Sequence, residues 1–232
     1  MILQVWNSHM ARPPSDALAP RKSPRQARSA ATVEAIRTAT IQVLLAEGVA
    51  RLTTTRVAER AGVSVGTMYQ YFPHKEALLF ALVREKVEAI ARAMEAAAQA
   101  LAGRPLMAIA DGLAEAWLAA KTDDIVGARA VYGIAAEFDI VDLTRAESQR
   151  LVDAVEHLLG TACDARVDRP HAVAFALLAV LGGAVRTVLE RGAGESELAV
   201  LRAELPRVCR AYLASSAVPR TLEAGRPQLT PA

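Results

Sequence analysis

Apolar positions recur at three- and four-residue steps along most of the chain, which is the period of an amphipathic helix. The first such stretch covers residues 29–47 and stops at Gly48, a residue type that commonly ends helices. Its repeating face consists of Val33, Ile36, Thr40, Val43 and Leu44. A helix is therefore expected here, preceded by a proline-rich, basic segment at residues 1–28 that we predict to be a disordered arm.

Two short helices and a longer one follow. The hydroxyl groups of residues 53–55 can cap a helix that ends at Gly62, where glycine permits a tight turn with positive φ. Ser64 is placed to cap a second helix over residues 65–71. Pro73 breaks that helix and introduces a longer one, from residue 74 to about residue 91, because proline at a helix start sacrifices no hydrogen bond.

The rest of the chain has the pattern of further helices. The breaks between them fall near residues 103–105, 122–124, 139–142, 168–170 and 192–194. No segment shows sustained period-two alternation, so we place no strand. The expected fold is all-α, and residues 217–232, which contain three prolines, are predicted to form a flexible tail.

The amino-acid composition supports an all-α fold, and the distribution of charge bears on the partner that the protein binds. Apolar residues make up 53% of the 232 positions but aromatic residues only 4%, and alanine and leucine lose little side-chain freedom in a helix. Residues 1–75 contain ten Lys/Arg and four Asp/Glu, a net charge of +6, whereas the other 157 residues carry 17 and 21, a net of −4. A basic front part indicates nucleic acid, with a solvated basic tail as the alternative.

The sequence does not favour a secreted, membrane-spanning or metal-dependent protein. Cys163 and Cys209 lack metal-type spacing and are expected to be buried apolar thiols, so we predict no disulfide, metal or cofactor. The longest apolar run, residues 172–185, is too short to cross a bilayer and ends at Arg186. Residues 1–10 have no positively charged region of the kind that begins a secretory signal, and a cytoplasmic location is expected.

Residues 52–79 contain the candidate chemistry. Two short helices joined by a glycine-containing turn form the pattern of a helix-turn-helix, and the second helix has a length that suits the DNA major groove. Gly66 would let its backbone approach the sugar-phosphate chain, while Lys75 and His74 open the next helix beside free N–H groups. Hydroxyl and amide groups suited to phosphates and base edges come from Ser64, Thr67, Tyr69 and Gln70.

This stretch also resembles the tetracycline-repressor (TetR) family of regulators, over roughly residues 30–80. The resemblance rests on Glu47-Gly48, Thr53-Thr54, Val57-Ala58, Ala61-Gly62-Val63-Ser64, Gly66-Thr67, Tyr69, Tyr71-Phe72, Lys75-Glu76 and Leu78-Leu79. Leu52 and Gln70 depart from it, because the family commonly has threonine and histidine there. These departures bear on phosphate contacts and on sequence preference.

The resemblance implies a role for each matching residue. Thr53, Tyr69 and Lys75 would contact phosphates, and Tyr71 and Phe72 would pack in the core of the small domain. Positions 65, 67 and 70 would face the groove. Together with the chemistry above, the predicted DNA-binding residues are Thr53, Thr54, Ser64, Val65, Gly66, Thr67, Tyr69, Gln70, His74 and Lys75.

Other interpretations of this region stay open. Tyr69 can instead be a core aromatic, Arg56 and Arg60 can lie on a solvated face, and the arm at residues 21–28 can be a solvated tail or a minor-groove arm. Residues 62–66 also match the G-x-S-x-G nucleophile elbow of hydrolases. That motif needs a strand before the serine, whereas residues 55–61 have a helical pattern, so we predict that the chain is not an enzyme.

The resemblance further implies a DNA-binding domain of three helices at residues 29–75 and a helical ligand-binding and dimerisation domain at 76–216. The last two long helices would pair with their copies in a homodimer. Residues 171–190 are apolar nearly all round and contain two adjacent glycines, which favours close helix–helix approach, with a monomeric core helix as the alternative. A dimer would hold its reading helices about 34–36 Å apart, as a palindromic operator in double-stranded DNA requires.

By the same resemblance, the C-terminal domain is expected to hold a small apolar effector. The expected function is a repressor that the effector releases from its operator by changing the spacing of the reading helices, through the helix from residue 74 to about 91. A regulator that senses a protein, or nothing, is the alternative. The candidate lining residues, each with plain core packing as its alternative, are Met94, Met107, Trp117, Tyr132, Phe138, His171 and Phe175.

Overall fold

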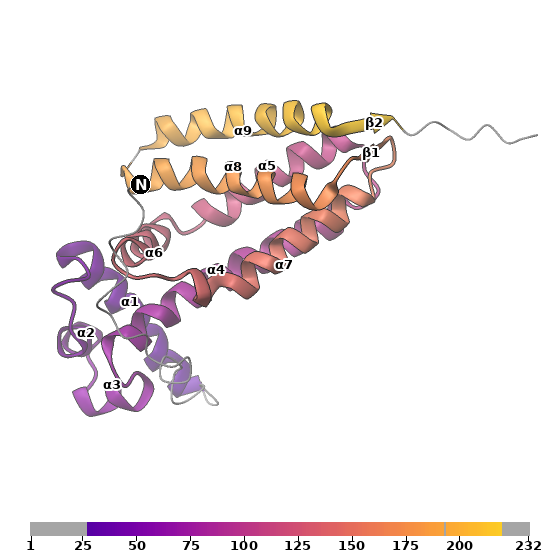
Figure 1. Cartoon of the computed structure of the whole chain (residues 1–232). Coiled ribbons are helices and arrows are strands. Elements are labelled where there is room, and N and C mark those ends of the chain that lie inside the picture. Colours follow the sequence, from indigo (N-terminus) through magenta and orange to yellow (C-terminus); the bar gives the residue numbers. More distant parts are fainter. Residues whose placement is uncertain (1–26, 193, 220–232) are drawn as a thin grey trace, which may run out of the picture. The chain divides into compact units, whose positions relative to one another are not determined.

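The computed structural model describes residues 27–192 and 194–219, and this part of the chain is almost entirely helical (Figure 1). The predicted arm therefore lies outside the described residues apart from residues 27 and 28, and the predicted tail apart from residues 217–219. The elements are α1 (Ala27–Glu47), α2 (Thr54–Ala61), α3 (Val65–Tyr71), α4 (Lys75–Leu101), α5 (Leu106–Thr122), α6 (Ile125–Glu137), α7 (Val141–Gly160), β1 (Ala165–Val167), α8 (Pro170–Glu190), α9 (Glu195–Ser216) and β2 (Ala217–Pro219).

These elements form two compact units. The first contains the described residues up to Lys86 together with Arg129–Leu143, and the second contains Val87–Ala128 together with the described residues from Thr144 onward. Helices α4, α6 and α7 contribute residues to both units. The all-α architecture expected from the sequence is confirmed, with differences in the length of α4 and in the segment after α7.

Helix α4 is longer than its pattern predicted. It continues to Leu101, about ten residues past the expected end. Ile90, Ala91 and Met94 continue its buried face, and the following residues are mostly alanine, which is the strongest helix former.

The prediction of no strand is wrong at two short segments. β1 pairs with β2 in an antiparallel two-stranded sheet, with Ala165 opposite Pro219 and Val167 opposite Ala217. The backbone N–H of Asp168 also donates to the carbonyl oxygen of Ser216 at 3.1 Å. Strands of three residues are too short to produce a recognisable alternation, and their pairing joins segments about 50 residues apart.

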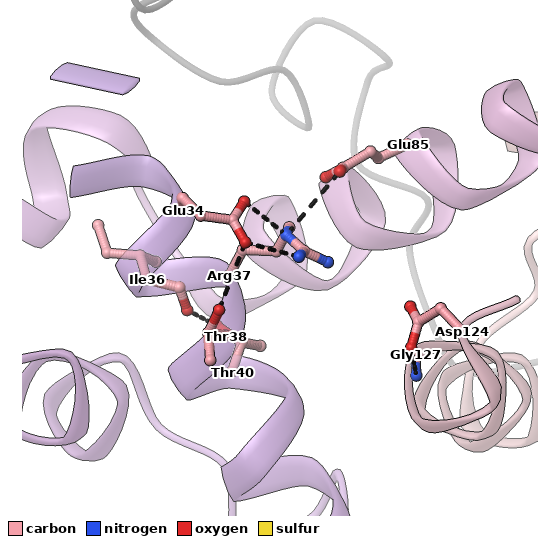
Figure 2. Close-up of polar contacts among 8 residues, drawn as sticks. All are labelled: Glu34, Ile36, Arg37, Thr38, Thr40, Glu85, Asp124 and Gly127. Atoms are coloured by element: carbon pink, nitrogen blue, oxygen red, sulfur yellow. Dashed lines mark hydrogen bonds and ion pairs between the residues drawn. The ribbon is translucent and has the colours of Figure 1, made fainter. Parts of the chain in front are cut away.

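The core of the first unit is built from the apolar faces that the pattern identified. Side chains from α1, α2, α3 and α4 bury one another, and the hydroxyl group of buried Thr40 is satisfied by donating to the carbonyl oxygen of Ile36 at 2.7 Å (Figure 2). Among the least exposed side chains are Ile36, Leu52, Val57, Ala58, Met68, Leu78 and Leu79.

Arg37 joins α1 to α4 on the surface of this unit. Its guanidinium donates to both carboxylate oxygens of Glu34, at 2.8 and 2.6 Å, and its Nε lies 3.9 Å from Oε1 of Glu85 (Figure 2). The hydrogen bonds from Arg37 hold the pKa of Glu34 below its ordinary value. Because these side chains are in contact with solvent, the pairs contribute only about 0.2–1 kcal/mol each.

The second unit packs α5, α8 and α9 around a common core. Its buried residues include Ile109, Leu113, Leu177, Leu181 and Leu205. At its surface, Arg210 of α9 forms an ion pair with Asp111 of α5, and Arg150 of α7 donates to Glu95 of α4 at 2.8 Å. The carboxylate of Asp164 accepts from the backbone N–H of Leu106 at 2.7 Å and so satisfies the first turn of α5.

The two cysteines differ in environment. Cys209 is buried, as predicted, and burial together with the charge of Asp111 raises the pKa of its thiol to about 11. Cys163 is exposed, so the prediction that it is buried is wrong. It lies in the turn between α7 and β1, which the apolar pattern placed inside a helix.

Helix α8 is, in the described part of the chain, the helix long and apolar enough to span a membrane by length and composition. Apolar core helices of soluble proteins meet the same criterion. In α8, however, only 39% of the most apolar window is buried inside the chain. Much of its apolar surface, including Phe175 and Val180, is therefore not covered by the residues that the structure describes.

The turn between α2 and α3 yields a stability prediction. Gly62 has φ +68°, a backbone conformation that an L side chain adopts at a cost of about 1–2 kcal/mol. We expect Gly62→Ala to lower the free energy of unfolding by that amount in urea denaturation. Gly133→Ala is the matched control: Gly133 lies within α6, and an added Cβ would meet nothing within 4 Å. Because alanine has a higher helix propensity than glycine, Gly133→Ala should raise the free energy of unfolding. Equal effects from the two variants would contradict the inference that the positive φ at position 62 requires glycine.

Candidate nucleic-acid interface

The turn between α2 and α3 sets the direction of the second helix. The backbone N–H of Gly62 donates to the carbonyl oxygen of Glu59 at 3.2 Å, and that of Val63 donates to Ala58 at 3.0 Å, which closes the end of α2. Two residues later, Oγ of Ser64 accepts from the backbone N–H of Thr67 at 2.9 Å and starts α3. Two short helices are thus joined by a rigid turn, which is the helix-turn-helix arrangement.

Helix α3 buries one side chain and exposes its other face. Met68 is fully buried in the core of the first unit, while Val65, Gly66, Tyr69 and Gln70 are exposed. Thr67 is half-buried, and its hydroxyl is hydrogen-bonded to that of Ser64 at 2.8 Å. Five of the predicted DNA-binding residues therefore lie on one seven-residue helix, and buried Met68 packs this helix against the core of the first unit.

Tyr69 is a surface residue and not a core aromatic. Its side chain is 44% exposed, and its hydroxyl accepts a hydrogen bond from Oγ1 of Thr54 at 3.3 Å. Thr54 is only 8% exposed, so its hydroxyl serves Tyr69 and does not face solvent. The neighbouring aromatics face inward: Phe72 is buried, and half-buried Tyr71 is hydrogen-bonded to Ser29 of α1 at 3.1 Å.

The remaining predicted residues lie at helix starts. Thr53 is exposed and caps α2, because its Oγ1 accepts from the backbone N–H of Arg56 at 3.2 Å. His74 precedes α4 and accepts at Nδ1 from the backbone N–H of Ala77 at 3.2 Å. Lys75, half-buried, is the first residue of α4. The structure thus gives Thr53, Ser64 and His74 a capping role in addition to any contact with a ligand.

The two arginines of α2 are held by α1 and by the loop that follows it. Arg56 forms an ion pair with Glu47 and donates to the carbonyl oxygen of Arg51 at 2.9 Å. Arg60 donates from Nε to the side chain of Gln42 at 2.8 Å. These contacts support the interpretation that both arginines belong to a solvated face that fastens α2 to its neighbours.

The G-x-S-x-G segment does not have the surroundings of a nucleophile elbow. The residues before Ser64 form helix α2 and the glycine turn, whereas the elbow requires a strand in that place. The Ser64 hydroxyl is engaged in capping α3.

The seven candidate effector residues are divided between the two units and differ in burial. Met94 and Trp117 are buried in the second unit, and Met107 is half-buried there. Tyr132 and Phe138 belong to the first unit, where the ring of Phe138 packs edge-to-face on Phe80 at 5.6 Å. His171 and Phe175 lie on the surface of α8. The sequence indicated their size and polarity but not the unit or the helix face on which each falls.

Trp117 has a feature that the sequence could not reveal. Its ring is 6% exposed, and the buried Nε1 has no hydrogen-bond partner among the described residues. The ammonium group of Lys121 lies 5.1 Å from the centre of the ring. Buried N–H groups in proteins almost always have an acceptor, so an unsatisfied indole in the interior requires an explanation.

Family comparisons agree with the helix-turn-helix. The family model described as bacterial regulatory proteins, tetR family, matches residues 36–82, and the tetracyclin repressor-like C-terminal domain model matches residues 105–213. Together the two matches cover most of the chain. Among proteins with curated functions, none matches this chain significantly.

Solved structures with the same fold include several regulators. The multidrug binding protein EbrR, crystallised with imidazole, is 26% identical, with a TM-score of 0.55 over 78% of this chain and 94% of its own. SmeT, the repressor of the Stenotrophomonas maltophilia multidrug efflux pump SmeDEF, is 21% identical, with a TM-score of 0.61 over 85% of this chain and 100% of its own. The fatty acid degradation regulator FadR from Bacillus halodurans is 15% identical, with a TM-score of 0.62 over 82% and 96%.

Proposed function

The chain belongs to the tetR family of bacterial regulatory proteins, and on this premise we propose that it is a dimeric, cytoplasmic repressor that a small apolar effector releases from a palindromic operator. The family consists of DNA-binding transcription regulators, which are generally not enzymes. The observation that carries the proposal is the geometry of α3. Its single buried residue, Met68, holds the helix in place while its other face is free to enter a major groove.

We assign reading and positioning to different residues. Gln70 and Val65 are exposed on α3, and a glutamine amide can form a bidentate contact with adenine. Lys75 at the start of α4 and the hydroxyl of Tyr69 would contact phosphates, which fix the register of the protein on DNA without reading sequence. Thr54 acts through Tyr69, because its buried hydroxyl orients the tyrosine.

The exposed apolar surface of α8 and α9 supports a homodimer through these helices. Phe175 and Val180 of α8 and Val200 and Val208 of α9 are all exposed in the single chain. The adjacent glycines of α8 fit the same proposal. A Cβ at Gly182 would make ordinary contact with Trp117 at 3.7 Å, and one at Gly183 would meet nothing within 4 Å. Packing within one chain therefore does not require either glycine, whereas close approach of a partner helix does.

The surroundings of Trp117 support an effector site in the second unit. A ligand that carries a hydrogen-bond acceptor on an apolar body would satisfy the buried Nε1 and bury its own surface beside the indole. Two structural neighbours were solved in complex with small molecules, EbrR with imidazole and SmeT with triclosan. Because α4 contributes residues to both units, a conformational change at the effector site would be transmitted to the helix-turn-helix through this helix.

The assignment of DNA contacts predicts different outcomes for two variants. Gln70→Ala should lose about 1–3 kcal/mol of discrimination at one base pair, because a base contact disappears. Lys75→Ala should weaken specific and non-specific binding alike and make the salt dependence shallower by about one unit of slope. Fluorescence anisotropy with the duplex upstream of the gene and a scrambled duplex, at several salt concentrations, measures both. Arg166→Ala removes an exposed cation from β1 and should change neither quantity. Unaltered preference of Gln70→Ala across operator variants would show that the reading face is misplaced.

The dimer proposal predicts that a charge on α8 separates the protomers. Phe175→Glu should shift the sedimentation coefficient to that of a monomer and weaken operator binding, because a carboxylate would be buried at the interface. Phe175 is 63% exposed in the single chain, and Val141, 62% exposed at the start of α7, offers a matched site. Val141→Glu should remain dimeric. A dimeric Phe175→Glu protein would place the interface elsewhere.

The effector proposal is tested with Trp117→Phe. Triclosan should release the wild-type protein from its operator duplex, and the phenylalanine variant, which keeps an aromatic ring but is smaller and lacks the N–H, should require a higher concentration for release. DNA affinity without triclosan should be the same for both proteins. Equal release of the two would show that the indole N–H does not contact this ligand, and a compound series with and without acceptor atoms would extend the comparison.

A further inference from the structure

A group of metal-ligating side chains lies on the second unit, where α7 contacts the start of α8. Asp153 and Glu156 of α7 and His171 of α8 each present a ligand atom, and these three atoms lie within 4.8 Å of one another. The two carboxylates are three residues apart on α7, so they share one face of that helix. His171 is the second residue of α8, and it comes from a segment that follows β1. Tertiary structure alone brings the histidine to the carboxylates.

The distance between His171 and Glu156 is close to that of two ligands of one ion. Nδ1 of His171 lies 2.7 Å from Oε2 of Glu156. Two ligand atoms bonded to one zinc ion at about 2.0–2.1 Å lie roughly 2.9–3.4 Å apart, so an ion could replace this contact with a movement of a few tenths of an ångström. Gln149 donates from Nε2 to Oδ1 of Asp153 at 2.8 Å, which orients that carboxylate and leaves Oδ2 for the ion.

Within the described ranges, neither carboxylate of the group faces a lysine or arginine. Most ion-paired carboxylates of this chain meet an arginine, as Glu95 meets Arg150 and Asp111 meets Arg210. In contrast, no lysine or arginine pairs with Asp153 or Glu156 among the described residues; their polar contacts are with the neutral Gln149 and with His171. Two carboxylates on one helix face repel each other, and a divalent cation would remove that repulsion.

We propose that Asp153, Glu156 and His171 bind one divalent transition-metal ion between α7 and α8, with Zn²⁺ as the best match. One imidazole and two carboxylates form a nitrogen–oxygen set that suits zinc and its neighbours, whereas calcium and magnesium prefer oxygen ligands alone. The three residues are exposed or half-buried, so water completes the coordination and the ion exchanges with solvent.

Binding at this place would fasten the start of α8 to the second half of α7. Both ends of the link lie in the second unit, and the segment between them contains the turn after α7 and strand β1. The ion would therefore close a loop of the chain and stabilise the folded form by mass action. This inference does not depend on DNA binding or on an effector, and its failure would leave the proposed function unaffected.

The test is titration of the tag-free, chelator-treated full-length protein with ZnCl₂ by isothermal calorimetry, and with CoCl₂ by visible absorption. We expect one equivalent per chain, cobalt d–d bands that zinc displaces, and a melting temperature that rises with zinc concentration. Glu156→Gln and Asp153→Asn keep the side-chain shapes but lose the charges, and each should weaken binding at least about tenfold. His171→Ala should abolish the cobalt bands.

His157→Ala is the matched control, because His157 is an exposed histidine adjacent to Glu156 but outside the group. It should bind zinc as the wild type does. The proposal is overturned if the wild-type protein takes up no zinc, or if Glu156→Gln and His171→Ala, shown to be folded by circular dichroism, bind as tightly as the wild type. A purely structural pair between His171 and Glu156 would give altered melting temperatures without any zinc dependence.

Discussion

The burial of Met68 is the interaction on which the reading helix depends. A helix of seven residues is far too short to be stable in isolation, because nucleation costs more than its few hydrogen bonds return. Met68 contributes an unbranched apolar side chain to a core formed by α1, α2 and α4, and the Ser64 cap and the glycine turn determine the angle at which α3 leaves it. The exposed residues of α3 are therefore held in place by buried Met68 and by the capped turn that precedes the helix.

The polar contacts of the first unit likewise position its exposed groups. Thr54 is buried and directs its hydrogen bond to Tyr69, and Arg56 and Arg60 secure α2 against its neighbours. The Thr54 contact orients Tyr69 on α3, and the arginine contacts fix α2, which the turn joins to α3. Under the proposed function this orientation matters, because base readout tolerates little error in the position of a side chain. Under the proposed function, substitutions at exposed Gln70 or Val65 would change the base contacts and leave the buried core unaltered.

The second unit has two surfaces on which the described residues leave apolar or acidic side chains uncovered. Helix α8 is apolar on nearly all sides, but only part of that surface is covered by α5 and α9. Exposure of several large apolar side chains on neighbouring helices is unfavourable in water, and association of two copies relieves it. The group around His171 is a smaller case, since neither of its two carboxylates pairs with a lysine or arginine among the described residues.

The sequence alone determined most of the helices and the helix-turn-helix, because helix formation and capping depend on residues close together in the chain. The helical period placed α1, α5, α6, α8 and α9 closely, and the capping and turn residues Thr53, Gly62 and Ser64 were enough to identify the helix-turn-helix. Tertiary structure decided what depends on contacts between distant segments: the β1–β2 pair, the exposure of Cys163, and the burial of Thr54 beneath Tyr69. It also decided the environments of the large residues on the C-terminal helices, which the sequence could not distinguish. Trp117 is buried, Phe175 is exposed, and His171 lies beside two carboxylates. The reason is physical: the period of a helix shows which residues share a face, but only packing shows what that face meets.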